Sequence, residues 1–559
     1  MRKLVPLLGI VLCLAQARAQ DDQCSFEKRR TKEMLEAQQL YTQKEYAKGA
    51  ALLEQLRNDP NLLHTDDKGA GVLYDLACFY SLLGEKDKAV KALGEAVAAG
   101  FTNADQMQND SDLANIRQEP EYQKLLAVVE ARSKAQQAFW DGPSLNTKYA
   151  DNLTEDEKIA GLSRLWSEAK YNFVYFDRLP NLDWDAAYFA YLPRVRASKS
   201  TAEYYTILTE FYAQLHDGHT GVGWPREVRD LSGYPAVSTR LIEGRVFIDF
   251  VRDPKLPDEG VSQGVEVVAV DGVPVKDYGA THVAPLVSAS SPQDRDRRTY
   301  EAQLLGGPKD APVELTIADA AGTTKRVKLP RLSPAEEDKL PPKPWKRFEF
   351  KMLPGDVAYV ALNAFGSEEI DKEFDAAFPE IQKSKALILD VRENEGGSSN
   401  IGYEILGYLT SKPFLSSQWS TRDYRPTSRA WGEPDRWYAE EGQPVSPHGG
   451  TPYAKPVVVL TSAETYSAAE DFVVAFDSMK RGTIIGEPTG GSTGQPLSFS
   501  LPGGGFARVC SKHDQYPDGR EFVGVGVQPQ VLVHPTIADF RASRDTVLEA
   551  ALQFVTRQE

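Results

Sequence analysis

The chain has 559 residues, of which 41% are hydrophobic and 26% are charged, and its formal net charge is −16. This length exceeds what one hydrophobic core holds, so we expect several domains. The acidic balance, without a run of Lys or Arg, argues against a nucleic-acid partner and against docking on an anionic membrane surface.

Residues 1–19 have the pattern of a secretory signal peptide. Arg2 and Lys3 precede the apolar stretch LVPLLGIVLCLA, and Ala-Arg-Ala closes the segment at Ala19. The apolar run is shorter than the roughly 20 residues that span a bilayer. We therefore predict export to a periplasm or to the extracellular space. A short membrane anchor and lipidation at Cys13 are the alternatives.

Export permits disulfide bonds, but the mature chain keeps an odd number of cysteines. Cys24 and Cys78 lie in one region and could pair, or these two and Cys510 could all be free thiols. Three cysteines in a chain of this size provide no framework for a metal site.

Residues 20–135 are predicted to form a helical domain. Apolar residues recur there at spacings of three and four. The stretch YDLACFYSLLGEKDKA, with small residues at Ala77 and Ala89, resembles tetratricopeptide repeats. Such an array would offer a concave surface to a protein partner, or it could be a helical cap without a ligand. We interpret residues 136–150 as a linker.

A second helical domain is predicted over residues 150–225. Thr154, followed by Glu155 and Glu157, has the pattern of a helix start. The domain ends in the polar, glycine-flanked segment LHDGHTGVG, which contains His216 and His219.

Residues 235–332 change to a β period, with short apolar runs separated by Asp-Gly and Ala-Gly turns. The segment GVSQGVEVVAVDGVPVKDY resembles the core of a PDZ domain, which binds an extended peptide as an added strand. Another kind of small β domain could show the same turns. The stretch SPAEEDKLPPKP, residues 333–344, is interpreted as a linker.

From residue 345 to residue 555, predicted strands alternate with predicted helices. KALILDVREN and KPVVVLTS are apolar strands, and each precedes a helical pattern. This alternation predicts a mainly parallel sheet covered by helices, so the fold class is multidomain α/β. Residues 496–509 have the pattern of a hairpin with a glycine turn.

Two strand-to-helix turns in this region carry chemically useful groups. In TSAETYSAAEDF, Ser467 begins a helix, where free N–H groups could stabilise an oxyanion, although the serine could equally be a helix cap. In LDVRENEGGSSN, the pair Gly396-Gly397 follows a strand. Its N–H groups could point at a developing negative charge, or the pair could form a simple turn.

The combination of these turns, in this order and after a PDZ-like segment, resembles the S41 serine peptidases, a family that includes the carboxyl-terminal processing proteases and the core of tricorn protease. The resemblance covers about residues 150–540 and implies a crotonase-like ββα core. It implies that Ser467 is the nucleophile. It also implies that the N–H of Ala468 and that of Gly396 or Gly397 bind the oxyanion.

A serine nucleophile needs a base. One branch of the family uses a lysine in G-E-P-T-x-G-K-G, but this chain reads GEPTGGSTG and has Ser492 at that place. The tricorn-like branch uses a histidine, and the resemblance places His219 there. A neutral imidazole suits this task. A metal pair formed by His216 and His219, or a turn cap, are the alternatives.

The third catalytic residue is less defined by the resemblance. Tricorn-like members use a glutamate before a G-V-x-P-D stretch, which favours Glu521 here, although Gln530 replaces the aspartate. Ser492 or Asp217 could serve instead. Gly218 stands where a serine is often found in that branch.

We therefore predict an exported serine endopeptidase that cleaves unstructured peptides or protein C-terminal tails through an acyl-enzyme. No metal and no organic cofactor is required, and no membrane insertion is expected. The alternative is a non-catalytic protein that binds an apolar ligand or a peptide on the same scaffold, because a fold alone does not settle function.

Overall fold

The computed structural model describes residues 26, 29–30, 32–62, 66–367 and 369–557. The predicted signal peptide and Cys24 lie outside the described residues. The chain divides into two compact units, Met1–Gly142 and Pro143–Glu559, and each is described by itself. In the described part of the chain, no helix combines the length and the apolar character that a membrane span requires.

The first unit is helical, as predicted. A helix over residues 32–42 is followed by α2 (Tyr46–Arg57), α3 (Asp66–Leu82), α4 (Lys86–Ala98), α5 (Ala104–Asn109), the 3-10 turn η2 (Ser111–Leu113) and α6 (Pro120–Trp140). The small residues Ala77 and Ala89 are fully buried where α3 and α4 pack together. The expected linker over residues 136–150 is wrong at its start, because α6 continues through Trp140.

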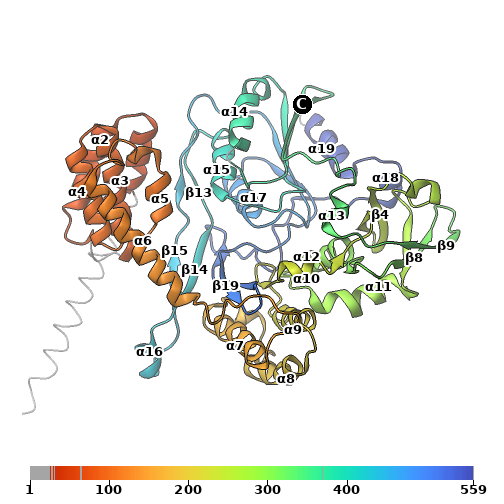
Figure 1. Cartoon of the computed structure of the whole chain (residues 1–559). Coiled ribbons are helices and arrows are strands. Elements are labelled where there is room, and N and C mark those ends of the chain that lie inside the picture. The colour runs from red at the N-terminus through yellow and green to blue at the C-terminus, as the bar shows by residue number, and fades with distance from the viewer. Residues whose placement is uncertain (1–25, 27–28, 31, 63–65, 368, 558–559) are drawn as a thin grey trace, which may run out of the picture. The chain divides into compact units, whose positions relative to one another are not determined.

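The second unit begins with the predicted helical segment. It consists of α7 (Glu155–Asn172), η3 (Phe176–Arg178), α8 (Trp184–Ala197) and α9 (Thr201–Ala213), which lie together in Figure 1. The helix start at Thr154 is confirmed, since Thr154 and Glu157 form a reciprocal capping box. After α9, residues 216–220 form a tight turn that we call the base loop. The chain then enters β1 (Gly221–Gly223).

Residues 235–332, which we call the β module, form an antiparallel sheet beside short helices (Figure 1). Its strands are β3 (Val237–Ile242), β4 (Arg245–Val251), β5 (Glu266–Val270), β6 (Val273–Pro274), β8 (Val313–Ala318) and β9 (Thr324–Leu329). Its helical turns are η4 (Leu256–Glu259), α11 (Val275–Tyr278), η5 (Gly279–Val283), η6 (Ala284–Leu286), α12 (Pro292–Arg297) and η7 (Arg298–Ala302). Between β1 and the module lie α10 (Arg226–Arg229) and β2 (Ser232–Gly233), which pairs with β7 (Gly307–Pro308).

The edge strand β3 of this module is not free along its outer side. The hydroxyl of Thr239 donates to the carbonyl of Tyr300 at 2.7 Å. The N–H of Leu241 donates to the carboxylate of Glu301 at 2.9 Å. Both acceptors belong to η7, so a peptide that adds to this edge would first have to displace η7 from it.

The C-terminal core contains a six-stranded sheet in the order β10-β11-β12-β17-β18-β22. The strands are β10 (Phe348–Leu353), β11 (Val357–Leu362), β12 (Ala386–Asp390), β17 (Val457–Thr461), β18 (Thr483–Gly486) and β22 (Val531–Leu532). All neighbouring pairs except β10–β11 are parallel, which agrees with the predicted βα alternation.

Helices cover both faces of this sheet (Figure 1). One face packs under α14 (Glu369–Ile381), α15 (Ser399–Gly407) and α17 (Ala468–Met479), and the other packs under α19 (Thr546–Thr556). The fully buried runs of β12 and β17 reflect this double cover. Smaller elements complete the core: α13 (Pro334–Glu337), β13 (Phe414–Leu415), α16 (Pro426–Ala430), β16 (Pro444–Val445) and α18 (Ile537–Arg541). The short helix α13 lies inside the stretch that we expected to be a linker.

Two three-stranded sheets add to the core, and the first of them connects it to the helical segment. β1 pairs with β20 (Gly505–Cys510), which forms the predicted hairpin with β19 (Pro496–Leu501). β14 (Gln418–Asp423) lies between β15 (Arg436–Glu440) and β21 (His513–Gln515). Because β1 directly follows the base loop, its pairing with β20 fixes that loop against the core.

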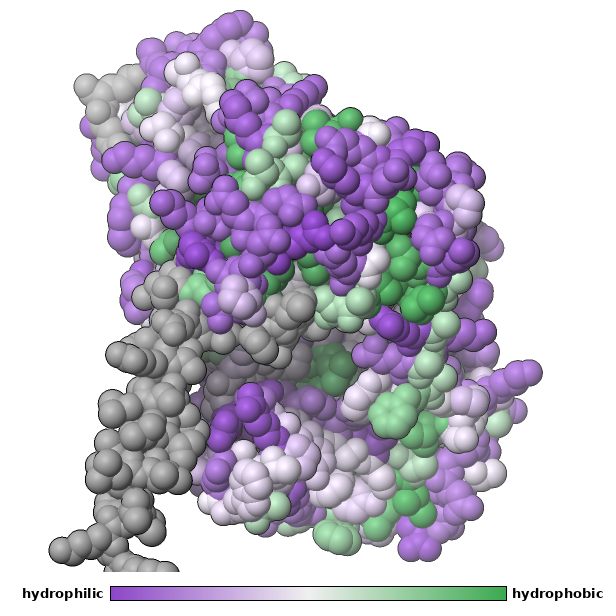
Figure 2. Space-filling model, turned by 90° about the vertical axis from the view of Figure 1, so that its left-hand side faces the viewer, coloured by the Kyte–Doolittle hydropathy of each residue, from purple (hydrophilic) through white to green (hydrophobic). Residues whose placement is uncertain are grey.

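The face shown in Figure 2 is mostly hydrophilic, with hydrophobic side chains in small separate patches.

Candidate active site

Ser467 stands at the turn between β17 and α17, as expected. It occupies the N-cap position of α17, but its side chain makes no capping hydrogen bond. Its backbone has φ 56° and ψ −126°, a conformation that costs a non-glycine residue roughly 1–3 kcal/mol. Its Oγ instead lies 3.1 Å from Nε2 of His219. The side chain therefore faces a proton acceptor, which a helix cap would not need.

His219 is the second member of the site and comes from the base loop, 248 residues earlier in the chain. Its Nδ1 lies 2.8 Å from Oγ of Ser492, so both ring nitrogens face serine hydroxyls. The ring is buried, with 6% of the residue exposed. Burial, helped by the positive charges of Arg508, Arg298 and Lys512, lowers the pKa of His219 to about 3. The imidazole is therefore neutral at neutral pH.

Ser492 is fully buried and is held by the carboxylate of Glu470. The N–H of Ser492 donates to Oε2 of Glu470 at 2.7 Å. The N–H of Gly491 and the hydroxyl of Thr489 donate to Oε1. Burial raises the pKa of Glu470 to about 8, against the opposite influence of these three donors. Glu470 contacts neither Ser467 Oγ nor the imidazole, so it anchors the loop that presents Ser492.

The glycine turn after β12 lies directly against Ser467. A Cβ atom at Gly396 would be 2.7 Å from Cβ of Ser467 and 3.0 Å from the backbone nitrogen of Ala468. Gly396 and Gly397 have φ of 103° and 136°, which side chains rarely allow. Only a glycine pair can follow this path so close to the serine.

The backbone N–H groups around Ser467 differ in whether they are free to donate a hydrogen bond to an oxyanion. The N–H of Gly396 donates to Oδ1 of Asn394 at 2.9 Å. The N–H groups of Ala468 and Gly397 have no acceptor among the residues that the structure describes. Asn394 also accepts, through its carbonyl, the N–H of Tyr466 at 3.0 Å. The asparagine thus joins the glycine turn to the serine turn.

Glu521 does not take the position that we expected for the third catalytic residue. Its carboxylate faces His513, Gln515 and Arg178 at 2.6 to 3.0 Å. An antiparallel bridge between Gln515 and Glu521 holds it there. The position beside Nδ1 of His219 is filled by Ser492, which was one of the two alternatives.

Asp217, the other alternative, is buried but points elsewhere. Its carboxylate accepts the hydroxyls of Thr220 at 2.6 Å and Ser290 at 3.1 Å. It therefore shapes the base loop. The metal pair that was considered for His216 and His219 has no geometric support, because both nitrogens of His219 are already engaged by serines.

Several residues near the site were not singled out in the sequence. Tyr466 stacks against the imidazole of His219, and Ser288 and Ser290 of the β module bond to the base loop. The polar stretch SASSPQDRDRR, which starts at residue 288, was the available signal. An unusually polar segment inside an apolar β pattern suggests a docking segment.

Comparisons with known proteins point to a family of peptidases. Residues 356–533 match the family model described as Peptidase family S41. The chain is 26% identical over 385 residues to a carboxyl-terminal-processing protease of Picosynechococcus sp., covering 65% of this chain and 82% of the relative. It is 25% identical over 426 residues to a carboxyl-terminal-processing protease of Synechocystis sp., covering 74% and 89%.

Among solved structures, the fold is similar to that of mature CPAF complexed with lactacystin. The TM-score is 0.58 at 15% sequence identity, and the match covers 72% of this chain and 99% of that chain. At this identity the likeness concerns the fold alone.

Proposed function

We propose that this chain, a serine-type peptidase of family S41, uses Ser467 as its nucleophile, His219 as its general base and Ser492 as the residue that orients the base. The observation that carries this assignment is the 3.1 Å contact between Ser467 Oγ and His219 Nε2. This distance lies within the range that proton transfer requires.

The proposed reaction follows from the tautomer that this contact requires. Nε2 must accept the proton of Ser467, so Nδ1 carries a proton and donates to Ser492. As Ser467 Oγ attacks a peptide carbonyl, Nε2 takes the hydroxyl proton and then gives it to the leaving amine. Water then attacks the acyl carbon while Nε2 takes one of its protons. The bond between that carbon and Ser467 Oγ breaks, and Nε2 returns the proton to Oγ, which releases the peptide acid and restores the serine.

The developing oxyanion would be bound by the N–H groups of Ala468 and Gly397. Both lack a partner among the described residues, and the first lies at the start of α17, where the helix dipole is positive. The N–H of Gly396 is already used by Asn394. Between the two glycines that the sequence left open, we therefore assign the donor role to Gly397.

The substrate class that we propose is an unstructured peptide or a protein C-terminal tail, as the names of the carboxyl-terminal-processing relatives suggest. We assign no metal and no organic cofactor to this reaction. The β module is proposed to be PDZ-like. Because η7 covers the edge of β3, strand addition there would require this helical turn to move. The first unit is proposed to be a tetratricopeptide-like domain that binds a protein partner.

Export is proposed from the charge and hydropathy pattern of residues 1–19. N-terminal sequencing of the protein secreted by its cell would test it. A mature chain that still starts at Met1 would contradict this proposal.

The assignment is tested by a fluorophosphonate probe, which reacts covalently with activated serines. The expected result is a single modified residue, Ser467, identified by mass spectrometry of the folded protein. Folded protein that remains unmodified, or modification at another serine, would contradict the assignment.

The pH dependence of this labelling reports the base. Because burial lowers the pKa of His219 to about 3, the imidazole stays neutral in mild acid. We expect the labelling rate to hold its plateau down to about pH 5, well below the pKa of roughly 6.5 of free histidine. A half-maximal rate near 6.5 would contradict a buried, neutral base.

Stability has to be followed in the same experiment. The folded pKa of His219 lies below the unfolded value, so only the unfolded chain binds this proton between about pH 6.5 and 3. The free energy of unfolding therefore falls as the pH falls through that window. Circular dichroism at each pH separates this loss of folded protein from protonation of the base.

Ser492→Ala tests the orienting hydrogen bond. We expect a roughly fivefold lower kcat, since one neutral hydrogen bond contributes about 1 kcal/mol. The measurement is steady-state hydrolysis of a disordered protein such as casein. Ser498→Ala, at an exposed position in β19, is the matched control, and an equal effect of both changes would remove the role of Ser492.

A further inference from the structure

Tyr466, the residue before the proposed nucleophile, lies flat against the proposed base. The two ring centroids are 5.2 Å apart, and the ring planes differ by 8°. Both residues are buried. The imidazole must point one nitrogen at Ser467 and the other at Ser492, so it tolerates little rotation. A parallel aromatic ring against its face restricts that rotation.

Gly218, next to the base, is shaped by this tyrosine. A Cβ atom at position 218 would lie 1.8 Å from the hydroxyl oxygen of Tyr466 and 3.0 Å from Oδ2 of Asp294. Gly218 is not among the described glycines with positive φ. Its lack of a side chain, and not its conformational freedom, is therefore what this position uses.

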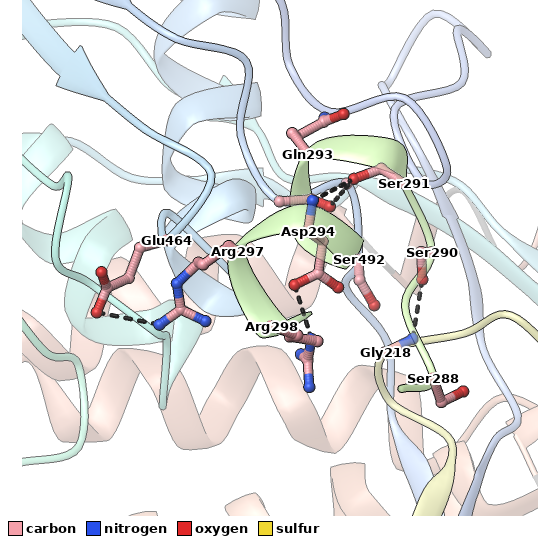
Figure 3. A network of polar contacts seen from close by, with 12 residues as sticks. Gly218, Ser288, Ser290, Ser291, Gln293, Asp294, Arg297, Arg298, Glu464 and Ser492 are labelled. Atoms are coloured by element: carbon pink, nitrogen blue, oxygen red, sulfur yellow. Dashed lines mark hydrogen bonds and ion pairs between the residues drawn. The ribbon is translucent and has the colours of Figure 1, made fainter. Parts of the chain in front are cut away.

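The β module supports the tyrosine from another side. The guanidinium of Arg298 lies 5.2 Å from the centre of the Tyr466 ring, a cation–π distance. Nε of Arg298 donates to Oδ1 of Asp294 at 2.7 Å, and Asp294 is fully buried. Figure 3 shows this ion pair on the helical segment that directly follows Ser290 and Ser291.

The two serines that precede this helical segment form hydrogen bonds with the base loop and with the loop that carries Ser492. Ser290 accepts the N–H of Gly218 at 3.0 Å, as drawn in Figure 3. Ser291 donates to the carbonyl of Gly490 at 2.6 Å, two residues before Ser492. The ion pair of Arg298 and Asp294 is thus fixed to the loops that carry the base and its orienting serine.

We propose that Tyr466 is a positioning residue for His219, that the Arg298–Asp294 pair holds its ring in place, and that Gly218 is required because the hydroxyl of Tyr466 fills the space of a side chain there. The proposal rests on the proposed function, since it takes His219 as the base. It gives the β module a part in catalysis that involves no contact with substrate.

The test is a double-mutant cycle on Gly218→Ala and Tyr466→Phe. Gly218→Ala should push the tyrosine off the imidazole and lower kcat for casein by roughly 100-fold with little change in KM. Tyr466→Phe keeps the ring and should retain most of the activity. Combined, the two changes should recover at least about tenfold over Gly218→Ala alone, a strongly non-additive result. Without the hydroxyl, the nearest ring atom is Cζ at 3.1 Å.

Gly221→Ala is the matched control, because a Cβ atom there meets nothing within 4 Å. It should leave kcat unchanged. If Gly218→Ala fails to fold, Tyr466→Leu tests the same claim without adding an atom at position 218. A lower kcat at constant KM then supports the proposal, and a wild-type kcat overturns it.

A second arm replaces the ion pair as a unit, Asp294→Asn with Arg298→Gln, so that no unpaired charge stays buried. The charges that lower the pKa of His219 are those of Arg508 and Lys512, on or after β20, and of Arg298 in the β module. The other titratable groups of the elements packed there include Tyr466, Asp217, Asp294, Glu470 and Cys510. Removing the charge of Arg298 should move the acid limb of the labelling profile to higher pH. Arg295→Gln, an exposed change on the same helix, should leave it in place.

Failure of this inference differs from failure of the function. Wild-type protein labelled at Ser467, together with additive effects in the cycle, overturns the role of Tyr466 and leaves the peptidase assignment intact. Wild-type protein that is not labelled at Ser467 overturns the assignment itself.

Discussion

Ser467→Ala is expected to lower hydrolysis of casein by roughly 10⁴- to 10⁶-fold, because removal of a serine nucleophile leaves only binding and oxyanion stabilisation. The loss should appear in kcat, since the hydroxyl contributes little to holding a peptide. The fold should persist, because the Ser467 side chain makes no capping hydrogen bond to α17. Steady-state kinetics and thermal unfolding on the same preparations measure both effects.

Ser478→Ala is the control for this change. Ser478 lies at the far end of α17, where its hydroxyl donates to the carbonyl of Val474, and its removal should leave kcat unaffected. Ser467→Ala protein that is folded and still cleaves casein at a tenth of the wild-type rate would show that another group performs the attack.

Much of the fold follows from local patterns in the chain. The buried runs of β12 and β17 are rich in Val, Ile and Leu, and each is followed by a helical pattern, so their identity and order could be predicted. Thr154 and Glu157 signal a helix start that depends only on neighbours along the chain. Local interactions dominate these elements, and the sequence expresses them directly.

The two groups of the reacting pair were also predictable, but by different means. Ser467 follows from a strand-to-helix turn that can be read locally. His219 could be placed only through the family resemblance, because 248 residues separate it from the serine. The pairing of β1 with β20 fixes the base loop against the core. No local pattern in the base loop predicts this pairing.

The residue that orients the base could not be predicted from the sequence. Glu521 was favoured because it precedes the stretch that resembles the G-V-x-P-D motif of tricorn-like members. In the structure its carboxylate lies beside His513 and Arg178 instead. Ser492 reaches the imidazole because Glu470 binds the backbone of its loop. That choice depends on packing between segments distant in the chain, as does the contact of the β module with the base loop.

His219→Ala is expected to have an effect nearly as large as the loss of Ser467, roughly 10⁴-fold or more in kcat. Without the imidazole, the Ser467 hydroxyl has no described acceptor for its proton, and its ordinary pKa leaves it a weak nucleophile. The reaction with the fluorophosphonate probe should slow in parallel, since the same deprotonation drives it. KM should change little, because the buried imidazole transfers protons during the reaction and contributes little to holding the peptide.

A matched variant and chemical rescue make this prediction specific. His216→Asn changes the other histidine of the base loop, and asparagine tolerates its left-handed φ of 47°. This variant should remain active.

His219→Ala leaves a space bordered by Tyr466, Ser467 and Ser492, so added imidazole should restore part of the rate. Restoration that rises with the fraction of neutral imidazole as the pH increases would identify the missing group as a base. Full activity of His219→Ala without imidazole would instead mean that the 3.1 Å contact plays no part in the chemistry.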